Sequence, residues 1–308
     1  MAIYKPDVLD FSDKTFCMVL SGQPGLGKTT LALSAPDPLL FDLDNGIARV
    51  RAEHRKLTTI DETYEELLSD MQTEEYKACK SVIIDTGGSL VQLMQPWAKT
   101  QDAKAARDGR AMYGVIKREF DRLTASIRND KKNCIIVFHT TETQKGDLTV
   151  TRLSCEGSSK DIVWTPADLG AHMFMLGQKR VIGFSPTEEY FAKSCFGISG
   201  IREIPTLKPG DKNDYLTRLF DEARANINKE MQTYAPQRAA YDKAMAHGRK
   251  IIDSVDALDK LNDALAQIGQ LEHALTSKKE LGALLNAKAK EINCKFSRED
   301  GAYVQNNA

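Results

Sequence analysis

The chain lacks the features that mark metal-binding, secreted or membrane proteins. Its six cysteines form no C-x-x-C pair, so nothing in their spacing indicates a zinc site. No apolar run approaches the length that spans a membrane, and the N-terminal segment does not have the shape of a signal peptide. We therefore expect a cytoplasmic protein that has no membrane partner.

The chain also lacks an excess of charge of either sign. Lysine and arginine number 42 and aspartate and glutamate 43, which gives a net charge of −1. Overall charge therefore does not indicate a nucleic-acid partner, although a local basic face is compatible with it. With 308 residues, of which 42% are hydrophobic, the chain can bury the core of one large domain or two smaller ones.

What the sequence does contain is a phosphate-binding loop in residues 21–30, SGQPGLGKTT. Gly22, Gly27, Lys28 and Thr29 match the pattern G-x-x-x-x-G-K-[ST]. The glycines let backbone N–H groups turn toward an anion, Lys28 reaches the outer phosphates, and the Thr29 hydroxyl binds Mg²⁺. The predicted nucleotide cradle comprises Gly22, Gln23, Pro24, Gly25, Leu26, Gly27, Lys28, Thr29 and Thr30.

Predicted strands and helices alternate around this loop. Apolar runs at 15–20, 38–46, 81–88 and 133–142 are typical of buried strands, and those at 38–46 and 81–88 end in acidic residues and a turn. Helical patterns fill the segments 29–34, 61–72, 89–99 and 111–129. On 111–129 the apolar side chains share one face, and they are Met112, Ile116, Phe120, Leu123 and Ile127. This alternation indicates a mainly parallel sheet covered on both faces.

The pattern changes after about residue 145. Short strand-like runs, including 189–197, predict β-hairpins appended to the sheet. From about residue 213 the pattern is helical, and two amphipathic stretches, at 251–268 and 281–296, predict a helical hairpin followed by a frayed tail. We expect a core domain at 1–212 and a helical C-terminal extension at 213–308.

Two acidic strand ends are candidates for phosphate chemistry. Asp85 ends an apolar strand about 55 residues after the loop, where a carboxylate holds the Mg²⁺ together with Thr29. Asp42 and Asp44 end the strand before it, and one of them is expected to orient and deprotonate an attacking water. Asp44 is the preferred candidate, and the alternative for either residue is a turn or helix cap.

Two further residues have weaker signals. His139 ends the strand at 133–142 with Thr140 beside it, at the edge where open α/β sheets bind ligands. It is a candidate sensor of the γ-phosphate, although a lone histidine is more often structural. Lys193 lies in the predicted 189–197 hairpin, where a lysine by itself is usually only solvated.

The order of these motifs resembles a RecA-like P-loop NTPase core. More closely, four stretches resemble phage-encoded RecA-like AAA-family ATP-binding proteins linked to single-strand annealing in DNA recombination. These stretches are SGQPGLGKTTLALSAPDPLLFDLDNG, SVIIDTGGSL, IIVFHTTE and RVIGFSPTEEYFAKSCFG. The resemblance covers roughly residues 10–205 and implies an α/β fold, ATP and Mg²⁺.

The resemblance also implies residue roles. Asp44 falls where RecA-type enzymes place a catalytic glutamate, and its side chain is shorter. Lys193 matches the first basic position of a K-x-R finger that reaches the neighbouring subunit's γ-phosphate, while Cys195 occupies the second. Such a finger implies a homo-oligomer, either a ring or a filament, with ATP at the subunit boundary.

In the family the segment after the sensor strand contacts DNA. Here that segment is about 141–170, with Lys145, Arg152 and Lys160 as candidates for phosphate contacts and Trp164 as a candidate for base stacking. The C-terminal helices are candidates for docking on the core, for assembly, or for recruiting a replication or recombination partner.

The expected function is that of a DNA-dependent ATP hydrolase that acts on single-stranded DNA in phage recombination, by annealing or strand exchange. A helicase-type motor or loader ATPase is one alternative, and a nucleotide-gated scaffold without significant hydrolysis is another. A small-molecule kinase is disfavoured because no lid or nucleoside pocket is evident in the sequence.

Overall fold

The computed structural model describes residues 11–146, 148–155 and 163–306, and these divide into two compact units. One unit is Phe11–Asn226, and the described residues of the other are 227–306. Each unit is considered by itself. Within the described residues, no helix combines the length and the apolar character that crossing a membrane requires.

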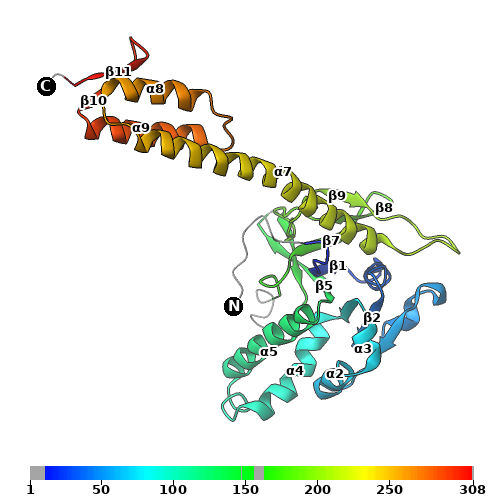
Figure 1. Cartoon of the computed structure of the whole chain (residues 1–308). Helices are drawn as coiled ribbons and strands as arrows, with labels where there is room; N and C mark the ends of the chain where they lie inside the picture. Colours follow the sequence, from blue (N-terminus) through cyan, green and yellow to red (C-terminus); the bar gives the residue numbers. More distant parts are fainter. Residues whose placement is uncertain (1–10, 147, 156–162, 307–308) are drawn as a thin grey trace. The chain divides into compact units, whose positions relative to one another are not determined.

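The first unit is built on one sheet (Figure 1). Its strand order is β3-β2-β4-β5-β1-β7-β8-β9, and neighbours from β3 to β7 run parallel. The bounds are β1 (Cys17–Gly22), β2 (Pro38–Asp42), β3 (Leu57–Thr59), β4 (Ser81–Asp85), β5 (Asn133–Lys145), β7 (Leu169–Leu176), β8 (Lys179–Gly183) and β9 (Ile201–Glu203). Every residue of β1, β2 and β4 is buried, as expected for parallel strands covered on both faces.

Helices cover both faces of this sheet. The bounds are α1 (Lys28–Ala32), α2 (Tyr64–Asp70), α3 (Glu74–Ala78), α4 (Gly87–Gln101) and α5 (Gly109–Asn129), with short 3-10 helices η2 (Ile47–Arg49) and η3 (Ala52–His54). The apolar face predicted for α5 is confirmed, since all five of its residues are buried. Near α1, the first turns of α7 (Tyr215–Asp253) pack against the sheet, where Phe220 stacks on Phe16. This is an α/β core with a mainly parallel sheet, as the sequence predicted.

Antiparallel hairpins extend the sheet, as expected. Residues 140–145 of β5 pair with β6 (Leu148–Leu153), and β7 pairs with β8. The hairpin predicted at 189–197 is wrong, because among the described residues this segment forms only an isolated β-bridge, between Gly170 and Lys193. Phe196 and Gly197 both have positive φ values, 56° and 73°, and this turn ends the extended run that the strand-like composition had suggested.

The second unit contains the C-terminal helices. Its elements are the later turns of α7, then α8 (Leu258–Gly269), α9 (Ser277–Glu291), β10 (Cys294–Ser297) and β11 (Ala302–Gln305). Its core includes Leu261, Ile268, Leu281 and Leu285. The two helices α8 and α9 lie side by side (Figure 1), which agrees with the predicted helical hairpin.

Two details of the C-terminal prediction are wrong. The stretch 251–268 is not one helix, because α7 ends at Asp253, where the Ser254 hydroxyl bonds the Ile251 carbonyl. Nor is the tail frayed, since β10 and β11 pair with each other. Tyr303 on β11 is only 3% exposed and its hydroxyl donates to Asn286 Oδ1 at 2.7 Å. Burial of this aromatic ring orders a segment whose composition resembles that of a loose terminus.

Candidate functional site

The predicted phosphate loop joins β1 to α1. Gly22 ends β1, and a Cβ atom there would lie 2.7 Å from the Met173 carbonyl oxygen, so only glycine fits beside β7. Gly27 caps α1 with a φ of 81°, in the left-handed region that favours glycine. The residue types in the motif are therefore the ones that this backbone path requires.

Lys28 is the first residue of α1 and is 4% exposed. Its Nζ donates to the Gln23 carbonyl at 2.9 Å and lies 3.1 Å from His139 Nδ1. Burial lowers the pKa of Lys28 to about 8, although the nearby carboxylates of Asp85 and Asp44 act in the opposite direction. The ammonium is thus held at the loop by a carbonyl and an imidazole, and its charge is sensitive to the surroundings.

Thr29 and Asp85 come together from two elements. The Thr29 hydroxyl donates to Asp85 Oδ2 at 2.6 Å. Burial raises the pKa of Asp85, while the hydrogen bond from Thr29 partly offsets that rise. A hydroxyl and a carboxylate are the oxygen ligands that Mg²⁺ prefers, with phosphate oxygens completing its shell. Within the described residues no cluster of three or more His, Cys, Asp or Glu side chains could hold a metal ion.

Asp44 lies just beyond the end of β2 and bonds two other elements. It accepts hydrogen bonds from Ser89 Oγ and, at 3.5 Å, from Thr86 Oγ1. His139 Nε2 lies 3.5 Å from Asp44 Oδ2, and this contact, followed by the Ser89 bond, lowers the pKa of Asp44 against the effect of burial. With Nδ1 accepting from Lys28, Nε2 carries the proton that faces Asp44.

Asp42 has a different position. It is fully buried, and its two oxygens accept the backbone N–H groups of Gly46 and Ile47, each at 2.7 Å. The strand β2 ends at Asp42, so Asp44 lies beyond the strand that it was predicted to end. Asp42 caps the turn after β2, which was the alternative considered for it.

These residues border one cavity of about 480 Å³. Its lining residues are Pro24, Gly25, Gly27, Lys28, Thr29, Thr30, Asp44, Gly46, Arg49, Val50, Asp85 and His139. The structure therefore brings Lys28, Thr29, Asp44, Asp85 and His139 together. Gln23 and Leu26 line a neighbouring cavity instead, and the Gln23 side chain donates to Glu142.

Arg49 was missed by the sequence analysis. It belongs to η2, five residues after Asp44, and lines the same cavity. Its only sequence signal is a basic residue soon after an acidic strand end and a glycine turn, and that combination is common on protein surfaces.

Lys193 lies apart from this cavity. Its Nζ donates to the Ala167 carbonyl, and its backbone pairs with Gly170 through two hydrogen bonds of 2.9 and 3.0 Å. Its ammonium is therefore engaged within its own chain.

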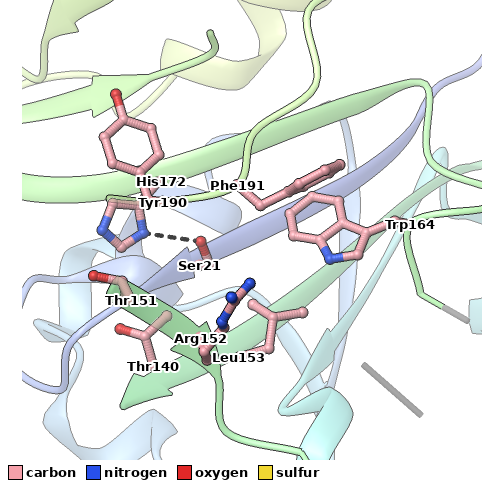
Figure 2. Close-up of a pocket in the computed structure, with 9 residues that line it drawn as sticks. All are labelled: Ser21, Thr140, Thr151, Arg152, Leu153, Trp164, His172, Tyr190 and Phe191. Atoms are coloured by element: carbon pink, nitrogen blue, oxygen red, sulfur yellow. Dashed lines mark hydrogen bonds between the residues drawn. The ribbon is translucent and has the colours of Figure 1, made fainter. Parts of the chain in front are cut away.

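Two of the predicted DNA-contacting residues, Arg152 and Trp164, line a second, smaller cavity. Arg152 on β6 lines this cavity of about 120 Å³ together with Ser21, Thr140, Thr151, Leu153, Trp164, His172, Tyr190 and Phe191 (Figure 2). Lys145 ends β5 and is exposed, and Lys160 lies outside the described residues.

Aromatic rings form much of the wall of the second cavity. The rings of Trp164 and Phe191 are 4.4 Å apart, and Tyr190 stacks on His172 at 4.7 Å. His172 Nδ1 lies 3.0 Å from Ser21 Oγ. Burial, reinforced by the charge of Lys28, lowers the pKa of His172 to about 4, so this imidazole is neutral at physiological pH.

Comparison with solved structures finds distant neighbours. A KaiC-like protein from Pyrococcus horikoshii OT3 is 14% identical, with a TM-score of 0.37, over 62% of this chain and 89% of its own. The flagellar accessory protein FlaH from Methanocaldococcus jannaschii is 13% identical, with a TM-score of 0.30, over 54% of this chain and 75% of its own. No curated protein matches the chain.

Comparison with family models finds a match over residues 14–196, which include the phosphate loop, Asp44, Asp85 and His139. The matched residues are more than half of the chain. They contain the whole cavity around Lys28. The chain therefore belongs to the AAA_24 family, whose model describes an AAA domain.

Proposed function

We propose that the chain binds ATP with Mg²⁺ in the cavity around Lys28 and hydrolyses it slowly. The single observation that carries this proposal is the contact between Thr29 and Asp85 at 2.6 Å, directly after the phosphate loop. It unites the hydroxyl and the carboxylate that a P-loop NTPase uses around its metal.

Each ionisable or polar residue of the cavity has a separate proposed role in hydrolysis. Thr29 and Asp85 would hold Mg²⁺, which when bound neutralises charge on the phosphates. Lys28 binds the outer phosphates, and the backbone N–H groups of the loop bind the rest. Asp44, which is ionised, accepts a proton from the attacking water. His139 lies between Lys28 and Asp44 and aligns both side chains.

We further propose that single-stranded DNA is the partner, in annealing or strand exchange during phage recombination. Support comes from the second cavity, which Arg152 lines together with Trp164 and Phe191 (Figure 2). Cations bind phosphates and aromatic rings stack on bases regardless of sequence. Ser21, which lines this cavity, directly precedes Gly22 at the end of β1, so bound nucleotide and bound DNA would share one strand end.

A ring or filament is the proposed assembly, with the C-terminal helices as a docking surface for a protein partner. For Lys193 to act on a neighbouring subunit's ATP, its bond to the Ala167 carbonyl must first break. Assembly is therefore expected to depend on nucleotide or DNA.

A gel-shift with labelled single-stranded DNA tests the DNA proposal. The native chain, Lys28→Ala, Arg152→Ala and the matched control Arg118→Ala, an exposed arginine on α5, are compared with and without ATP and Mg²⁺. Arg152→Ala should weaken binding and reduce the slope of log affinity against log salt by about one, and Arg118→Ala should have no effect.

If no form binds DNA under any condition, the recombination role is wrong and the nucleotide proposal stands alone. Unwinding with strong turnover would favour a motor, and tight ATP binding without phosphate release would favour a scaffold.

A further inference from the structure

Arg49 and Asp44 both line the nucleotide cavity. Gly46 and Asp44 border the cavity beside it, while Asp85 and Lys28 border it from β4 and α1. Within the described part of the chain, the Arg49 guanidinium forms no ion pair with a carboxylate, unlike Arg122 and Arg202, which pair with Glu119 and Glu222. An arginine without a partner beside a phosphate-binding loop has donors available for an anion.

The turn after β2 fixes the position of Arg49. The buried Asp42 carboxylate accepts the N–H groups of Gly46 and Ile47, and η2 with Arg49 follows at once. A Cβ atom on Gly46 would lie 2.8 Å from Arg49 Nη2, so the guanidinium folds back over this glycine. The buried end of β2 thereby sets where the exposed arginine lies.

The charges that line the cavity indicate that the Arg49 guanidinium can help to neutralise a bound triphosphate. Besides the His139 ring, the ionisable lining residues are Lys28, Arg49, Asp44 and Asp85, so cations and carboxylates are equal in number. A nucleoside triphosphate with one Mg²⁺ retains about two negative charges, and Arg49 supplies one of the two lining cations. Its planar guanidinium can make two parallel bonds to one phosphate.

The position along the cavity identifies the phosphate. Thr30 and Gly27 border the cavity where α1 begins, whereas Asp44 borders it where water must attack the terminal phosphate. The Arg49 guanidinium lies over Gly46, which follows Asp44 by two residues in the same turn. We propose that Arg49 binds the terminal phosphate of the nucleoside triphosphate held by its own chain, and so distinguishes the triphosphate from the diphosphate.

This inference deepens the proposed function and depends on ATP binding at Lys28. Its consequence is that terminal-phosphate recognition operates within a single subunit, whereas the role proposed for Lys193 requires a neighbour.

The test compares dissociation constants for a non-hydrolysable ATP analogue and for ADP, both with Mg²⁺, on the full chain. The variants are Arg49→Ala, Arg49→Lys, Gly46→Ala and the control Arg51→Ala, an exposed arginine whose Nη1 bonds the Leu207 carbonyl. Gly46 has φ −88° and ψ −16°, a conformation that alanine adopts freely. The methyl group added by Gly46→Ala would therefore clash first with the Arg49 guanidinium and not with the backbone. Thermal unfolding of each variant checks that the fold is kept.

Arg49→Ala should weaken analogue binding about tenfold, the effect of losing one charged contact to phosphate, and should leave ADP binding unchanged. Arg49→Lys and Gly46→Ala should also weaken binding of the analogue, but by a smaller factor. Arg51→Ala should leave the binding of both nucleotides unchanged. Equal weakening of both nucleotides, or no weakening of either, would overturn the proposal for Arg49 while leaving the proposed function intact. If the native chain bound neither nucleotide, the proposed function would fail and this inference with it.

Discussion

Lys28 shows at the scale of a single residue how burial tunes the site. Its ammonium is removed from water yet lies near two carboxylates, and burial prevails, lowering the pKa to about 8. An anion bound at the loop favours the charged form. Nucleotide binding is therefore coupled to the protonation of Lys28.

The affinity for ATP should fall as the pH rises, because Lys28 loses its charge. Below about pH 7 nearly every free Lys28 is charged, so ATP affinity should be constant, and as the pH rises above 8 affinity should fall by up to about tenfold per pH unit. Binding measured from pH 6.5 to 9.5 checks this expectation. In Lys28→Arg, whose charge does not titrate in this range, the affinity should be independent of pH. A native profile as flat as that of the arginine variant would contradict the account of Lys28.

Asp44 and Asp42 are two residues apart but should fail in different ways when altered. Asp44→Asn should reduce phosphate release about a hundredfold while ATP affinity changes little, because Asp44 borders the cavity without belonging to the loop. Asp42→Asn should instead lower the free energy of unfolding by about 1–3 kcal/mol, since one charged acceptor of a backbone N–H is lost. Phosphate release and thermal unfolding measured on both variants separate the roles, and a native turnover rate in Asp44→Asn would rule out Asp44 as the base.

At the scale of elements, the approach of α4 to β5 positions the side chains around Asp44. Gly87 begins α4, and a Cβ atom there would lie 2.2 Å from the Phe138 ring. Thr86 and Ser89, which bond Asp44, flank this contact.

Gly87→Ala should therefore destabilise the fold by about 1–3 kcal/mol and lower the rate of hydrolysis together with stability. The matched control is Gly114→Ala in α5, where the nearest atom is the end of Arg118 at 3.9 Å. That change should stabilise the helix by about 0.5–1 kcal/mol. Chemical denaturation measures both, and equal stability of the two variants would show that α4 does not depend on this contact.

Helices, strands and loops could be predicted from the sequence where the local spacing of residues determines them. The β1 to α1 loop and the apolar face of α5 follow from spacing and periodicity, and both are as predicted. The break between α7 and α8 and the pairing of β10 with β11 were not predictable, because Val255 and Tyr303 are buried by tertiary packing that no local pattern records. In the site, motif spacing identified Lys28 and Thr29, but the proximity of Arg49 depends on how the turn after β2 folds.

For the whole molecule, the division into two compact units has a thermodynamic consequence. If ATP binds at Lys28 as proposed, it should stabilise only the unit that contains Lys28, by about 2.7 kcal/mol at a hundredfold excess over its dissociation constant. Tyr303→Ala should destabilise only the C-terminal unit, by about 3–5 kcal/mol. Calorimetry of the full chain should thus resolve two transitions, one shifted by ATP and the other by the substitution. A single transition shifted by both would contradict this independence.

The central claim is that one triphosphate is held by the loop around Lys28, with its metal held between Thr29 and Asp85. Equilibrium dialysis of the full chain against radiolabelled ATP with Mg²⁺ tests this claim most directly. The account predicts about one ATP retained per chain and a loss of at least a hundredfold in affinity in Lys28→Ala, as expected when a buried charged contact to phosphate is removed. Failure of the native chain to retain ATP, or equal retention by the native chain and Lys28→Ala, would contradict it.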